Sequence, residues 1–96
     1  MMPHQIIQIT NLNDEGLVVK KPIAVELTSD EGQIIAAFRA AEIISSGDTV
    51  IETIDWLKDI IASTFRTFLA ERKDLGPFPT HQLEILEEHI EQREAP

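Results

Sequence analysis

The sequence lacks cysteine and tyrosine, and its aromatic residues are one tryptophan and four phenylalanines among 96 residues. Without cysteine the chain can form no disulfide, no thiolate nucleophile and no cysteine-ligated zinc site. Because aromatic residues are so few, the hydrophobic core must be built mainly from aliphatic side chains. The length suits one domain with one modest core, so we expect residues 1–96 to fold as a single unit.

Basic residues are also scarce, since 8 Lys and Arg stand against 17 Asp and Glu, for a formal net charge of -9. Nucleic acids and anionic membranes are bound largely through Lys and Arg, so we expect direct contact with neither. The charge favours a basic protein partner, although an excess of carboxylates can also serve solubility alone. No apolar run approaches the length of a membrane span, and the N-terminus shows no secretory signal. We therefore expect a soluble, cytoplasmic protein.

The first half of the chain has the pattern of short strands. Residues 5–10 predict a strand or ordered arm, and residues 17–19 could pair back on it as a hairpin across residues 1–22. Residues 23–28 alternate between apolar and polar side chains, which is typical of a half-buried antiparallel strand. Residues 33–39 predict its hairpin partner.

The turn between these two strands places Gly32 where left-handed geometry is needed. For residues 40–46 a helical interpretation remains open, but Ile43 and Ile44 favour a third strand. Together these patterns predict an α+β fold with a small antiparallel sheet of about three strands.

The second half of the chain predicts two helices. Gly47 suits a tight turn, and Asp48 or Thr49 can cap the helix that follows. Glu52 stands three residues after Thr49, which is the spacing of a capping box. We expect this long helix to end near Lys73, so that residues 23–73 hold the sheet and the main helix. Its apolar stripe consists of Ile54, Leu57, Ile61, Phe65, Phe68 and Leu69.

We expect Gly76 to be the C-terminal cap of the main helix. Two prolines follow it within three residues, and proline prevents the helix from continuing. A short C-terminal helix is expected over residues 80–93. Its apolar face consists of Leu83, Leu86 and Ile90.

Two segments carry a resemblance to a known family. Residues 35–39 stand at the second strand of the pattern, and Gly47-Asp48-Thr49-Val50-Ile51-Glu52 stands at its helix start. Over residues 23–73 the chain resembles the HicB-like antitoxins, the partners of small RNA-cleaving toxins. It departs from the family at Arg39, where proline is usual, and over residues 40–44.

The resemblance implies a long helix packed across a three-stranded antiparallel sheet. It also implies a non-enzymatic binding module that occludes a small basic RNA-cleaving toxin. Typical members carry a C-terminal DNA-binding domain in addition. We do not carry that domain over, because the final segment is short and acidic. The chain therefore looks like a divergent, stand-alone member of the family.

No residue is predicted to be catalytic, to bind a cofactor or to ligate a metal. A ribonuclease-H-like site would need several carboxylates around Mg²⁺, and the strands offer only Glu26 and Glu42. His81 shares a helix face with Glu84 and Glu88, a set that could hold a metal but is ordinary on an acidic helix.

The candidate interface residues are Trp56, Ile60, Arg39 and Glu42. Trp56 lies beside the apolar stripe, so it either widens the core or faces a partner; Ile60 follows one turn later. Arg39 and Glu42 lie in the region that often faces the toxin in the HicB-like family. The alternative to an antitoxin is an orphan structural or regulatory domain that forms a homodimer or higher oligomer through its sheet edge and the Trp56 flank. A short, basic, neighbouring reading frame would favour the antitoxin.

Overall fold

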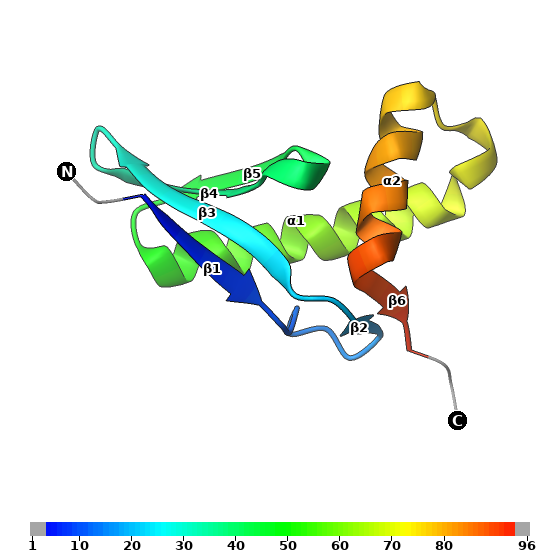
Figure 1. The fold of residues 1–96 in the computed structure, drawn as a ribbon, viewed down its shortest axis with the longest axis horizontal. Coiled ribbons are helices and arrows are strands. Elements are labelled where there is room, and N and C mark those ends of the chain that lie inside the picture. Colours follow the sequence, from blue (N-terminus) through cyan, green and yellow to red (C-terminus); the bar gives the residue numbers. More distant parts are fainter. Residues whose placement is uncertain (1–3, 94–96) are drawn as a thin grey trace.

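The computed structural model describes residues 4–93. Four antiparallel strands, in the order β1-β3-β4-β5, form the main sheet, and a long helix lies along one of its faces (Figure 1). The strands are β1 (Gln5–Ile9), β3 (Ile23–Asp30), β4 (Gln33–Phe38) and β5 (Ile43–Gly47). The α+β class is confirmed. The sheet has four strands rather than three, because β1 pairs with β3 instead of forming a separate arm.

Alternation along the strands sorts side chains between a covered and an uncovered face. Ile23, Val25 and Leu27 of β3 are all buried on the face that receives the long helix. The β3–β4 hairpin turns at Glu31 and Gly32, both of which have positive φ, 49° and 83°. The left-handed geometry predicted for Gly32 is therefore confirmed, and it fits the tight turn that joins the two strands.

The long helix α1 spans Val50–Ala70 and begins as the sequence predicts. The Thr49 hydroxyl accepts a hydrogen bond of 3.1 Å from the amide of Glu52. A side chain at Gly47 would stand 2.8 Å from the Thr53 hydroxyl, so the close approach of helix and strand requires glycine there. The helix ends earlier than the predicted Lys73, and residues Arg72–Asp74 form a separate 3₁₀ turn, η2.

The C-terminal part of the chain corrects two predictions. Gly76 does not cap α1; it is extended and precedes the second helix α2, which spans Pro77–His89. Proline in a first helical turn has no amide bond to lose, so Pro77 begins this helix instead of delaying it to residue 80.

The expected continuation of α2 to residue 93 is also wrong, because Ile90–Gln92 form a strand, β6. This strand pairs with β2 (Leu17–Val19) in a small second sheet. The predicted hairpin between residues 5–10 and 17–19 therefore does not form. Leu83, Leu86 and Ile90 are buried, as their shared apolar face predicts.

Candidate protein interface

No helix of the described part of the chain covers the second face of the main sheet (Figure 1). The uncovered face of a two-layer antiparallel sheet is usually polar. Here it carries exposed apolar side chains, with Ile6 of β1 58% exposed and Ile44 of β5 57% exposed. Ile35 is half-buried between them on β4. Two exposed isoleucines and one half-buried isoleucine, on three of the four strands, make this face a candidate docking surface.

A hollow of about 390 Å³ lies at one end of this uncovered face. Small side chains create it, since Ala24, Ala37 and Ala40 stand where larger residues would fill the space. Its other lining residues are Ile6, Lys21, Pro22, Glu26, Phe38, Arg39 and His89. The hollow is apolar at its centre and charged at its rim, an arrangement that suits one apolar side chain of a partner.

Glu26 and Arg39 form a two-point ion pair beside this hollow. Arg39 Nε donates to Glu26 Oε2 at 3.0 Å, and Arg39 Nη2 donates to Oε1 at 2.8 Å. His4 Nε2 lies 3.2 Å from Oε2. The hydrogen bonds from Arg39 are the main reason that the pKa of Glu26 lies below its ordinary value. Both carboxylate oxygens of Glu26 are therefore engaged in this pair.

The loop that departs from the HicB-like pattern is a 3₁₀ turn, η1 (Arg39–Ala41), followed by Glu42 in the left-handed region with φ 55°. Glu42 donates its amide to Arg39 O at 3.0 Å, which closes the turn. Gln82 of α2 holds the loop from outside, because its Nε2 donates to Ala41 O at 2.7 Å. Arg39 and Glu42 themselves remain exposed.

His89 supports the same corner from within the core. Its ring meets Phe38 edge to face, with centroids 5.2 Å apart. His89 Nδ1 lies 2.9 Å from Ile85 O, and a carbonyl oxygen can only accept, so this nitrogen carries the proton. His89 is buried because the end of α2 packs against Phe38 of β4, a contact between distant segments that no local sequence pattern indicates.

Trp56 and Ile60 lie on the outer side of α1, away from the loop at Arg39. Trp56 is 58% exposed and Ile60 is 36% exposed. The core alternative for Trp56 is therefore excluded, and its side chain is available to a partner. The four predicted interface residues fall on two surfaces: Trp56 and Ile60 on the helix, and Arg39 and Glu42 around the corner of the sheet.

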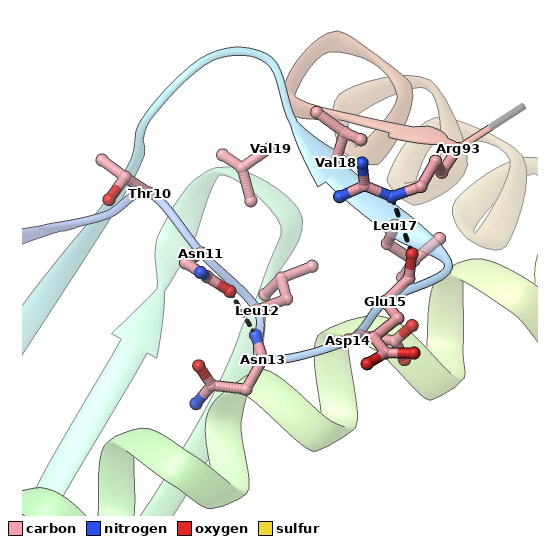
Figure 2. Close-up of a pocket in the computed structure, with 10 residues that line it drawn as sticks. All are labelled: Thr10, Asn11, Leu12, Asn13, Asp14, Glu15, Leu17, Val18, Val19 and Arg93. Atoms are coloured by element: carbon pink, nitrogen blue, oxygen red, sulfur yellow. Dashed lines mark hydrogen bonds between the residues drawn. The ribbon is translucent and has the colours of Figure 1, made fainter.

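A polar hollow of about 320 Å³ lies under the loop of residues 10–19 (Figure 2). Arg93 Nε donates to the Glu15 carbonyl at 2.8 Å and fixes β6 to this loop. On the far side of the loop, Arg66 of α1 donates twice to Asp14, at 2.6 Å each. These bonds tie the loop to the helix and to the C-terminal strand, so we assign the hollow a structural role.

Within residues 4–93 no three His, Asp or Glu side chains gather closely enough to hold a metal ion. His81, Glu84 and Glu88 do not form such a group. None of the helices in that part of the chain is both long and apolar enough to span a membrane. Comparisons with protein-family models, curated proteins and solved structures found no match.

Proposed function

We propose that the chain is a non-enzymatic protein-binding module that resembles a HicB-like antitoxin and holds a small basic RNA-cleaving toxin on its uncovered sheet face. The observation that carries the proposal is the set of exposed isoleucines on that face of a strongly acidic protein. Ile6 and Ile44 offer apolar contact, and a net charge of -9 attracts a basic partner.

One end of the uncovered face is acidic and the other end holds an apolar hollow, and both features suit a basic protein partner. At the β3–β4 turn, a second hollow of about 520 Å³ is lined by Asp30 and Glu31 together with Ile35 and Ile44. These carboxylates can pair with Lys or Arg of the toxin, while the apolar hollow beside Arg39 receives one of its aliphatic or aromatic side chains. The toxin would then be held by apolar contact and by charge, and its RNA-binding surface would be occupied.

We assign the charged groups of this face a role in binding the toxin and no role in catalysis. Glu26 is ionised and committed to Arg39, so it offers neither a proton nor a free metal-binding carboxylate. A toxin that cleaves cellular RNA acts in the cytoplasm, and we place this protein there with it.

The test uses the short basic reading frame next to the gene. We expect its product to arrest growth when expressed alone and to cleave RNA, and we expect co-expression of this chain to restore growth. Ile6→Arg puts a positive charge into the docking face and should abolish protection. Ile51→Arg, at a side chain that is 76% exposed near the start of α1, is the matched control and should protect fully. A toxin neutralised equally by both variants would overturn the choice of face, and absence of any toxic partner would overturn the function.

The alternative is an orphan structural or regulatory domain that associates with itself. The exposure of Trp56 and Ile60 favours it, because tryptophan is enriched at interfaces. Self-association without a toxic basic neighbour would support this second function.

A further inference from the structure

The apolar hollow beside Arg39 lies where β3 and β4 separate at the end of the main sheet. The register of the two strands ends at the pair Glu26 and Ala37, although β3 begins three residues earlier, at Ile23. β4 ends at Phe38, and the chain turns away into η1. The first three residues of β3 therefore have no partner on β4 among the described residues, and the hollow of about 390 Å³ lies against this stretch.

His89, at the end of α2, joins the two strand ends at this point. Its carbonyl oxygen accepts from the amides of Lys20 and Lys21, at 2.8 and 3.3 Å, just before β3 begins. Its ring stands edge to face against Phe38, the last residue of β4. His89 thus bridges the two strand ends, and it is one of the residues that line the hollow.

One ring nitrogen of His89 has no partner among the described residues. Nδ1 donates to Ile85 O, so in the neutral ring Nε2 carries no proton and can only accept a hydrogen bond. His89 is only 7% exposed, yet Nε2 is not sealed in the core, because Ser45 Oγ is the one fully buried side-chain nitrogen or oxygen in residues 4–93 that lacks a partner. The Nδ1 edge of the ring faces α2, so the Nε2 edge is the part of the side chain that is left to line the hollow.

An occupant of the hollow has to satisfy this acceptor. A purely apolar side chain would displace water from Nε2 and leave the nitrogen buried without a partner, which is costly. A cationic side chain would lie beside Lys21 and Arg39, while Glu26 at the same rim is already paired with Arg39. A neutral N–H or O–H donor avoids both penalties.

The size and the rim of the hollow favour an aromatic ring as the carrier of that donor. Small-molecule sites have volumes of about 300–1,000 Å³, so this hollow has room for a single ring. The N–H groups of Arg39 that bind Glu26 lie in the plane of the guanidinium, so its flat face remains available to stack on a ring. Tyrosine and tryptophan combine a large apolar ring with one hydrogen-bond donor.

We propose that the hollow beside Arg39 is a specificity pocket for one tyrosine or tryptophan side chain of the basic partner, whose O–H or N–H group donates to His89 Nε2. The small side chains of Ala24 and Ala37 leave room for the ring, and Arg39 stacks on it from the rim. This inference rests on the proposed function, because it names the side chain by which the partner is recognised. Phenylalanine is disfavoured, since it fills the same space and leaves Nε2 without a partner.

The pocket can be tested on the unaltered chain with two soluble probes, N-acetyltyrosinamide and N-acetylphenylalaninamide, which differ by one hydroxyl group. In NMR titrations the tyrosine probe should shift the amide signals of Ala24 and Ala37, and it should bind about twofold to tenfold more tightly than the phenylalanine probe. Only the tyrosine probe should move the nitrogen resonance of His89 Nε2. Equal affinity of the two probes, absence of binding, or shifts confined to other residues would overturn the proposal.

Two variants locate the site and its acceptor. Ala24→Leu fills the hollow and should abolish binding of both probes, whereas Ala70→Leu, at the exposed end of α1, is the matched control and should bind them normally. His89→Phe keeps a ring against Phe38 and removes Nε2, so the two probes should bind it equally. If His89→Phe still prefers the tyrosine probe, the assignment of Nε2 as the acceptor is wrong.

The pocket and the proposed function fail in different ways. Absence of a toxic basic neighbour would refute the function, while a preference for the tyrosine probe would still support the pocket. A toxin that Ala24→Leu neutralises as well as the unaltered chain does would leave the function standing and refute the role of the hollow in recognising the partner.

Discussion

The start of α1 depends on a single side-chain cap, and removing it gives a well-defined prediction. Thr49 Oγ1 accepts from the amide of Glu52 at 3.1 Å, which satisfies one of the otherwise unpaired donors of the first turn. Loss of such a cap costs about 1 kcal/mol. For a domain of this size that corresponds to a fall in Tm of about 4–8 °C. We therefore expect Thr49→Ala to unfold at a melting temperature lower by this amount, measured by circular dichroism.

Two further variants separate the cap from its neighbours. Thr49→Ser keeps the hydroxyl and should melt close to the unaltered protein. Glu52→Gln keeps the capped amide and removes only the negative charge near the helix N-terminus. It should therefore lower the free energy of unfolding by at most about 0.3–1 kcal/mol. The second half of a capping box, a bond from the Glu52 carboxylate to the Thr49 amide, is not formed in the described residues. If Thr49→Ala has the same melting temperature as the unaltered protein, or if Glu52→Gln lowers the melting temperature more than Thr49→Ala does, the reasoning about this cap is wrong.

Two other predictions concern the loops that frame the candidate interface. The pKa of Asp14 is lowered from 3.8 to about 2, chiefly by hydrogen bonds from Arg66 and then from the Gly16 amide. A group whose folded-state pKa is depressed stabilises the fold above its ordinary pKa and loses that effect as the pH falls through the lowered value. The Tm difference between the unaltered protein and Asp14→Asn should thus be full at pH 7, shrink as the pH falls below about 4, and be lost below pH 2; a difference independent of pH would contradict it. Gln82→Ala removes the 2.7 Å bond to Ala41 O and should cost about 0.5–1.5 kcal/mol in urea unfolding, whereas His81→Ala, at an exposed neighbouring position, should cost nothing measurable; equal losses would contradict the role of Gln82.

Features governed by near neighbours in sequence were the predictable ones. Thr49 and Glu52 are three residues apart, and Gly32 lies two residues after the end of β3, so propensity and hydrogen bonding act within a few residues. The pairing of Leu17–Val19 with Ile90–Gln92 joins distant segments, and no local pattern of either one indicates the other. The start of α2 was missed for a different reason. Pro77 was read as a helix breaker, although proline is compatible with a first turn.

The candidate site was predicted in part. Trp56 was identified from its position beside the apolar stripe of α1, and the structure leaves it exposed. The uncovered sheet face was missed, although the sequence carries a signal for it. Ile6 and Ile7 in β1, like Ile43 and Ile44 in β5, are adjacent apolar residues, and adjacent residues of a strand point to opposite faces.

The two candidate functions can be separated because they use different elements of the fold. Binding of a basic partner uses the uncovered face of the main sheet, where Ile6 lies on β1 and Ile44 lies on β5. Self-association would use α1, where Trp56 and Ile60 are exposed. Ile6→Arg should therefore impair binding of a basic partner and spare self-association, whereas Trp56→Ala should impair self-association and spare binding of the partner. If both variants impair both properties equally, the two surfaces are not independent and the separation argued from their places in the fold fails.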